Sequence, residues 1–297
     1  MTPNAQAYLQ EALDIMEQYA LGRDQIDWGH LRHSAWETAR EAQTCADTHQ
    51  AIHNAAWTTN EHSFLISPVV ERRKPTKAVN TELSGEIVAD RIGYIHLPKF
   101  SATSESEELA FATQMQNMIR QLDSTNPEGW IVDLRDNQGG NMWPMLAGIG
   151  PILGEGHVGS FVTSDHQHNW FYQEGCAGID NETVICVQEA AYEVQAPMPP
   201  VAVLTSRETA SSGEAITIAF RGRPKTRSFG QATKGRSTAN QSFTLSDGAI
   251  LVLTVSLFAD RTGHTYGEAV VPDEIIPDRD TILPATIQWL TSQFQDR

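Results

Sequence analysis

The 297-residue chain is poor in long apolar runs and in positive charge. No segment offers about 18 consecutive apolar residues, and the N-terminus lacks a basic stretch followed by an apolar one, so we predict neither a membrane span nor a secretion signal. The 21 Lys and Arg against 37 Asp and Glu leave a formal net charge of −16, which argues against nucleic acid and anionic membranes as partners. We therefore expect a cytoplasmic protein.

Cysteine is also scarce. The chain has three, Cys45, Cys176 and Cys186, which are too few for a disulfide framework, and none has zinc-finger spacing to a second ligand. We expect reduced, structural thiols. Cys176 and Cys186 flank a possible hairpin, and we expect them to pair only if the protein is exported.

The residues that are present are typical of a globular protein, with 40% hydrophobic and 20% charged. Helical spacing of apolar residues predicts a small helical subdomain over residues 1–67, in which Trp28 and Trp36 pack in a core. From residue 68 short apolar strands alternate with helices, which predicts an α/β core over 68–297. The segment from about 157 to 199 has no clean period, and we interpret it as an inserted β-rich cap.

Two strand-turn-helix units stand out in the core. In the first, an apolar run over 130–134 is followed by polar residues and the pair Gly139–Gly140 before an apolar helix. In the second, an apolar run over 201–205 is followed by a turn and by a helix from Ser212. The pair Asp247–Gly248 between two apolar strands predicts a β-hairpin.

The segment Thr209–Glu214 is the first that suggests chemistry, because two hydroxyls stand where a buried strand gives way to a helix N-terminus. A backbone N–H next to such a serine can face a developing oxyanion, and the helix dipole favours negative charge there. The alternative is that Ser211 or Ser212 only caps the helix, with Glu214 in a capping box. On this segment alone, capping is the favoured interpretation.

Three further segments change that balance: 133–140, 230–236 and 267–273. In this order the four segments resemble the motifs of the carboxy-terminal processing, or tail-specific, serine peptidases, over about residues 62–273. The run Asn-Gln-Gly-Gly-Asn-Met-Trp-Pro-Met and the doubled serine before Gly-Glu most resemble the nisin-resistance-protein branch, and next the tricorn-core branch. The resemblance implies a central twisted sheet flanked by helices, the processing-peptidase or crotonase-like core. No region of the sequence resembles the PDZ domain that typical members carry, so we expect none.

The resemblance also implies roles for single residues. Ser211 matches the nucleophile, because it precedes Glu214 by three residues as the family serine precedes its glutamate, and Ser212 is the second candidate. The lysine that processing peptidases pair with this serine is matched by Arg236, which stays protonated and cannot act as a base. Lys234 is two positions out of register.

A base is still required, because a serine hydroxyl is a weak nucleophile until a neighbour accepts its proton. His62, in Asn-Glu-His-Ser-Phe-Leu, resembles the histidine that nisin-resistance and tricorn-type members use instead of lysine. We predict that it is the base, with Lys234 or a merely capping histidine as alternatives, and we expect His96 to pack beside the sheet. The histidines of the cap have no metal-ligand partners at suitable spacing, so we expect them to face solvent: His157, His166 and His168.

Backbone N–H groups near the serine would complete the site, and glycine permits the close approach that they need. We predict an oxyanion hole made by Gly139 or Gly140 together with the N–H of Ser212. We expect Asp133 and Arg135 to pair and to stabilise their turn.

The sequence thus predicts a serine endopeptidase that cleaves peptides near their C-termini, with a peptide or protein C-terminus as partner and with no cofactor or metal. Glu214, Glu268 and Arg236 are candidates for supporting roles: Glu214 to orient a neighbour or cap the helix, and Glu268 to orient the base. The alternative is a non-catalytic module that binds a small molecule or peptide on the same fold, as retinoid-binding relatives suggest. An esterase or amidase is a weaker third hypothesis. The substrate and the oligomeric state stay open.

Overall fold

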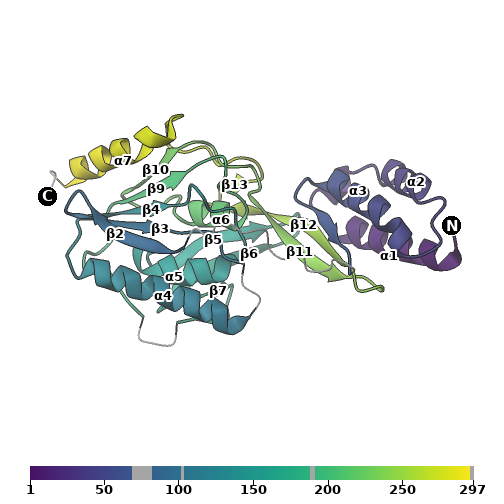
Figure 1. Cartoon of the computed structure of the whole chain (residues 1–297), viewed down its shortest axis with the longest axis horizontal. Helices are drawn as coiled ribbons and strands as arrows, with labels where there is room; N and C mark the ends of the chain where they lie inside the picture. The colour runs from purple at the N-terminus through teal and green to yellow at the C-terminus, as the bar shows by residue number, and fades with distance from the viewer. Residues whose placement is uncertain (69–81, 102–103, 188–190, 295–297) are drawn as a thin grey trace. The chain divides into compact units, whose positions relative to one another are not determined.

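The structure is a computed structural model that describes residues 1–68, 82–101, 104–187 and 191–294. The chain divides into two compact units, which can be followed by residue number in Figure 1. Each unit has a hydrophobic core of its own. Unit 1 comprises Met1–Val79, Thr163–His166 and Thr238–Leu257, and unit 2 comprises Asn80–Val162, Gln167–Ser237 and Phe258–Arg297.

Unit 1 combines three helices with a small antiparallel sheet. The Thr2 side chain caps the first helix by accepting a hydrogen bond from the N–H of Ala5. The hairpin predicted around Asp247–Gly248 is present, and a short strand near His62 pairs with its second strand. The elements are α1 (Pro3–Tyr19), η1 (Arg23–Gln25), α2 (Trp28–Thr38), η2 (Ala46–Thr48), α3 (His49–Thr59), β1 (Phe64–Ile66), β11 (Thr238–Thr244) and β12 (Ile250–Ala259).

The core of unit 1 is shared between the helices and the hairpin. Leu13 of α1 and Leu251 of β12 are both fully buried in it, and Trp28 and Trp36 pack against it as predicted. The helical residues 1–67 therefore fold together with a hairpin from the far end of the sequence. Helical periodicity alone gives no sign of this partner.

Unit 2 contains a six-stranded sheet with the order β14-β10-β9-β4-β3-β2, in which only β2 is antiparallel to its neighbour. β4 and β9, the two predicted apolar strands, are buried at every position. α4 packs against β2 and β3, and α7 packs against β9 and β10 from the opposite face (Figure 1). The bounds are β2 (Ser84–Val88), β3 (Ile92–His96), α4 (Glu105–Asp123), β4 (Gly129–Asp133), α5 (Met142–Leu153), β9 (Val201–Thr205), α6 (Ser212–Ala219), β10 (Thr226–Gly230), β14 (Glu274–Ile275) and α7 (Arg279–Gln293).

The predicted cap is an antiparallel meander of four strands between α5 and β9. The pairing register skips one residue in β5, Val158, and one in β8, Val184, and such bulges increase the local twist of a sheet. Nearby, β13 pairs with the last two residues of β12. The strands are β5 (Gly156–Val162), β6 (Gln167–Gln173), β7 (Cys176–Ile179), β8 (Glu182–Cys186) and β13 (Thr265–Tyr266).

The cap contains a disulfide that the sequence analysis did not favour. Cys176 begins β7 and Cys186 ends β8, and the antiparallel register sets them directly opposite each other, where they are bonded. The expectation of two reduced thiols is therefore wrong. In the described part of the chain Cys45 is free, and no helix there is both long and apolar enough to cross a membrane.

Candidate active site

Ser211 lies at the sharp corner between β9 and α6 in unit 2. Its φ of 53° and ψ of −118° are in a region that costs an L-residue about 1–3 kcal/mol, so surrounding contacts must hold the backbone there. The side chain is half-buried. A strained serine between a buried strand and a helix is the arrangement by which α/β-hydrolases present a nucleophile.

The neighbouring serine has a different role. The hydroxyl of Ser212 donates a hydrogen bond to the carbonyl of Gly140 at 2.6 Å, and the residue is 7% exposed. Gly139 approaches Ser211 so closely that a Cβ at Gly139 would lie 2.8 Å from that of Ser211. The glycine pair and the serine pair, which the sequence predicted to share one site, are thus in contact within unit 2.

The two glycines differ in the use of their N–H groups. The N–H of Gly139 donates to Oδ1 of Asn137 at 2.9 Å. Within the described ranges no hydrogen bond uses the N–H of Gly140. On either side of it, the carbonyl of Gly139 accepts from the N–H of Phe100, and the N–H of Asn141 donates to the carbonyl of Phe100. Ser212 supplies the first N–H of α6, which has no acceptor inside the helix. These contacts leave Gly140 and Ser212 as the pair of donors suited to a developing oxyanion.

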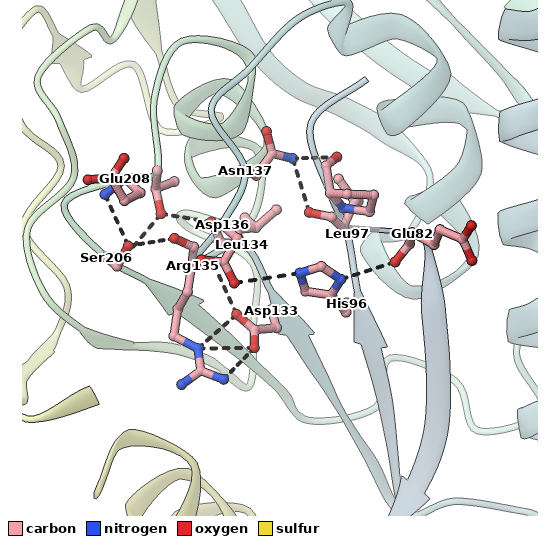
Figure 2. Close-up of polar contacts among 12 residues, drawn as sticks. Glu82, His96, Leu97, Asp133, Leu134, Arg135, Asp136, Asn137, Ser206 and Glu208 are labelled. Atoms are coloured by element: carbon pink, nitrogen blue, oxygen red, sulfur yellow. Dashed lines mark hydrogen bonds and ion pairs between the residues drawn. The ribbon is translucent and has the colours of Figure 1, made fainter. Parts of the chain in front are cut away.

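Asn137 fixes the glycine turn, a role that the sequence analysis missed. It is fully buried, and its Nδ2 donates to the carbonyls of Leu97 and Pro98 at 3.2 and 3.1 Å (Figure 2). Its backbone carbonyl accepts a hydrogen bond from the N–H of Ala210. Asn137 therefore joins the end of β3, the glycine turn and the serine corner. Asn137 lies in the segment 133–140 that carries the family resemblance, but the sequence does not show whether its side chain is buried.

Glu214 connects Ser211 to a second loop. The carboxylate is fully buried and accepts hydrogen bonds from the N–H groups of Ser211, Gly235 and Arg236 at 2.8, 2.9 and 2.8 Å, and from the hydroxyl of Thr233. Burial raises the pKa of Glu214 above its ordinary value, while these donors act in the opposite direction. Glu214 thus belongs to the capping box of α6 and bonds to the backbone of Ser211, Gly235 and Arg236. Arg236 contributes its backbone N–H here.

Asp133 and Arg135 pair as expected (Figure 2). Arg135 Nε lies 3.0 Å from both carboxylate oxygens and Nη2 lies 2.6 Å from one of them, while the hydroxyl of Tyr94 donates to the same oxygen. Burial acts to raise the pKa of Asp133, but the hydrogen bonds and charge of Arg135 outweigh it and hold that pKa below its usual range. The turn after β4 is thus fixed by a buried ion pair, and Ser206 donates to the carbonyl of Arg135.

His62 is a buried histidine of unit 1, with 9% of its surface exposed. Its Nδ1 lies 2.9 Å from Oγ1 of Thr238, its N–H donates to Oδ1 of Asn60, and its carbonyl accepts from Asn240. These contacts fix both the backbone and the ring. Sequence analysis did not identify Thr238, because one hydroxyl residue among many carries no signal of a histidine partner.

The other candidates lie as follows. His96 ends β3, where its Nδ1 lies 3.3 Å from the carbonyl oxygen of Glu82 and its Nε2 lies 3.9 Å from a carboxylate oxygen of Asp136 (Figure 2). The side chains of Lys234 and Glu268 are exposed, and that of Arg236 is partly buried. No group of His, Cys, Asp and Glu in the described residues could hold a metal ion. The cap histidines are exposed, as expected: His157, His166 and His168.

The family model for "Peptidase family S41" matches residues 91–278. The nisin-resistance protein of Lactococcus lactis subsp. lactis is 26% identical to this chain over 298 residues, which cover 99% of this chain and 89% of that protein. A carboxyl-terminal-processing protease of Synechocystis sp. is 25% identical over 217 residues, 71% of this chain and 45% of that protease. The chain therefore corresponds to less than half the length of the latter relative.

Solved structures give the same picture of the fold. A lipoprotein from Streptococcus agalactiae superimposes with a TM-score of 0.79 at 25% identity, covering 99% of this chain and 98% of that one. The photosystem II D1 C-terminal processing protease superimposes with a TM-score of 0.64 at 15% identity, covering 93% and 94%. The predicted α/β fold, a sheet flanked by helices, is confirmed.

Proposed function

The chain belongs to peptidase family S41, and from this premise we propose that it is an endopeptidase that cleaves peptides near their C-termini with Ser211 as nucleophile and His62 as base. The family and the carboxyl-terminal-processing relatives make the chain a serine peptidase, a hydrolase of peptide bonds. The names of these relatives support a C-terminal cleavage site. The proposed substrate is an extended peptide or protein C-terminus.

The observation that carries the proposal is the difference between two adjacent serines. The hydroxyl of Ser212 is engaged with the carbonyl of Gly140. Ser211 occupies the strained corner beside the glycine turn and is more exposed. A nucleophile needs an accessible hydroxyl with oxyanion donors nearby, and these contacts favour Ser211 over Ser212.

In the proposed reaction, Oγ of Ser211 attacks the scissile carbonyl carbon and its proton passes to His62. The contact between Nδ1 and Thr238 supports this role, because it orients the ring and makes Nε2 the nitrogen that exchanges the proton. The N–H groups of Gly140 and Ser212 stabilise the oxyanion, an effect worth about 10²–10³ in kcat for each donor. His62 then protonates the leaving amine, and water hydrolyses the acyl-enzyme.

Intact-mass measurement after treatment with a fluorophosphonate tests the proposal without knowledge of the substrate. We expect one adduct on the wild type and none on Ser211→Ala. Ser212→Ala is the matched control, because it removes a hydroxyl one residue away and should still be labelled. His62→Ala should be labelled more slowly, since its serine lacks a base.

Each other outcome has a defined meaning. An adduct on Ser211→Ala that disappears in Ser212→Ala would move the nucleophile to Ser212. Unchanged labelling of His62→Ala would remove His62 from the mechanism. No adduct on the wild type, together with saturable peptide binding and no cleavage, would favour the non-catalytic binding module.

A further inference from the structure

The cap of unit 2 carries a groove of about 980 Å³, at the upper end of the range of about 300–1,000 Å³ that is usual for ligand sites. Strands β5 to β8 and their turns line it, and it shares no residue with the serine corner. The bulges at Val158 of β5 and Val184 of β8 lie in strands that form it. Bulges bend and twist a sheet locally.

The floor of the groove is partly apolar. The ring of Phe171 lies over Gly178, where a Cβ would come within 2.7 Å of two ring carbons. The disulfide between Cys176 and Cys186 and the side chain of Val187 also line the groove. Because the disulfide ties β8, the last strand of the meander, to β7, the apolar floor is held in place without a ligand.

The rim of the groove is acidic. Glu174 and Asp180 line it and are exposed. The carboxylate of Glu155 accepts the backbone N–H of Glu174, so a third acidic group lies beside them. The carboxylate of Asp180 bonds to His168 and to the N–H of Asn169, contacts that lower its pKa and keep it charged at neutral pH.

The surrounding sequence supplies no permanently charged cation, lysine or arginine, to balance these carboxylates. From residue 136 to residue 206 the chain contains no lysine and no arginine, although it contains aspartates and glutamates throughout. This stretch includes the whole cap, and among the residues that the structure describes no lysine or arginine lines the groove. A surface with charges of one sign attracts partners of the opposite sign.

We propose that this groove binds a polypeptide segment in which lysine or arginine residues stand next to apolar ones. The cationic groups pair with Glu174 and Asp180, and the apolar side chains cover Phe171 and the disulfide. A small polyamine would leave the apolar floor exposed, and an apolar ligand would leave the carboxylates without cations. The site is additional to the proposed peptidase function and does not depend on Ser211.

Fluorescence anisotropy with a labelled peptide of alternating lysine and leucine tests the proposal. The titration uses the full-length Ser211→Ala chain, so that cleavage does not affect the signal. We expect saturable binding at about 0.05 M salt that weakens markedly at about 0.5 M, because salt screens exposed ion pairs. A glutamate-leucine peptide of the same length should not bind. The double variant Glu174→Gln/Asp180→Asn should bind the lysine peptide roughly three- to tenfold more weakly.

Two further variants separate a groove from a general charge effect. Glu37→Gln/Glu86→Gln changes the net charge equally at exposed positions outside the groove and should bind like the parent. Glu174→Gln alone serves if the double variant unfolds, because no described hydrogen bond involves that side chain. Equal weakening in the control, equal binding by all variants, or displacement by spermine at the peptide's own binding concentration would overturn the proposal.

Discussion

Glu214 and Asp133 are both buried carboxylates of unit 2, 0% and 2% exposed, yet their pKa values shift in opposite directions. Burial raises the pKa of Glu214, whose partners are three N–H groups and a hydroxyl. The same burial acts on Asp133, but Arg135 outweighs it. Both carboxylates accept a similar number of hydrogen bonds, so the presence or absence of a neighbouring cation decides whether the pKa is lowered or raised.

The opposite pKa shifts of Glu214 and Asp133 go with different structural roles. Glu214 holds Ser211 and the loop at Gly235 with neutral donors only, so its charge responds to pH. Asp133 anchors the turn that leads to the glycine pair, and its ion pair keeps it charged over a wide pH range. Changes at these two residues should therefore differ in size and in pH dependence.

The largest effect is expected from Asp133→Asn. The change leaves the guanidinium of Arg135, whose side chain is 13% exposed, without its carboxylate, and breaking such a buried pair costs about 3–5 kcal/mol. The free energy of urea unfolding, followed by tryptophan fluorescence, measures the loss. Asp133→Asn/Arg135→Met should recover part of it, and a loss as small as that of an exposed pair would show that solvent already screens Arg135.

Glu214→Gln comes next. An amide offers one acceptor and one donor group, so its NH₂ must face the N–H of Ser211 and Arg236 or that of Gly235, and at least one N–H loses its partner. We expect a loss of about 1–3 kcal/mol in unfolding free energy. If Ser211 is the nucleophile, kcat should fall by about 10² because the serine corner shifts. Glu208→Gln, an exposed change close by, is the control and should have neither effect.

The pH dependence of stability separates the two carboxylates. Glu214 has a raised pKa in the folded state, so its contribution to stability increases as the pH falls from neutral through that pKa. Asp133 has a lowered pKa in the folded state. Its contribution to stability is therefore complete above the pKa of about 4 that aspartate has in the unfolded chain, and it is lost only below that pH. Above the unfolded pKa of glutamate, about 4.3, the stability difference between wild type and Glu214→Gln should widen as the pH falls, and that for Asp133→Asn should stay constant. Parallel curves for both would contradict the assignment.

The smallest effect is expected from Tyr94→Phe. The hydroxyl of Tyr94 donates to Asp133 at 2.6 Å while Arg135 keeps its own contacts. Its removal should cost about 0.5–1.5 kcal/mol, measured by the same urea titration, and should raise the pH at which stability is lost in acid. A loss as large as that of Asp133→Asn would mean that the hydroxyl, and not the cation, dominates the site.

Local sequence patterns predicted the elements that carry the site. The runs at 130–134 and 201–205 became the fully buried strands β4 and β9, because uninterrupted apolar residues between turn signals suit a strand covered on both faces. The order of the motifs indicated the family, and Asp133 pairs with Arg135 as expected because the two are neighbours in sequence.

Contacts between distant residues were not predictable in the same way. Asn137 bonds to the end of β3, and Thr238 bonds to His62 across most of the chain, and nothing in the spacing of either residue records its partner. The pairing of Cys176 with Cys186 was missed for another reason. The expected compartment was given more weight than the register of the hairpin, which sets the two residues opposite each other.

The glycine pair has a consequence for how sequences of this kind diverge. A Cβ at Gly140 would lie 1.8 Å from the carbonyl oxygen of Phe100, and because that oxygen belongs to the backbone, no compensating substitution removes the clash. Selection for folding alone therefore retains glycine at this position. In a lineage that has abandoned hydrolysis Gly140 would persist, and under the proposed mechanism replacement of Ser211 or His62 would be the record of the lost activity.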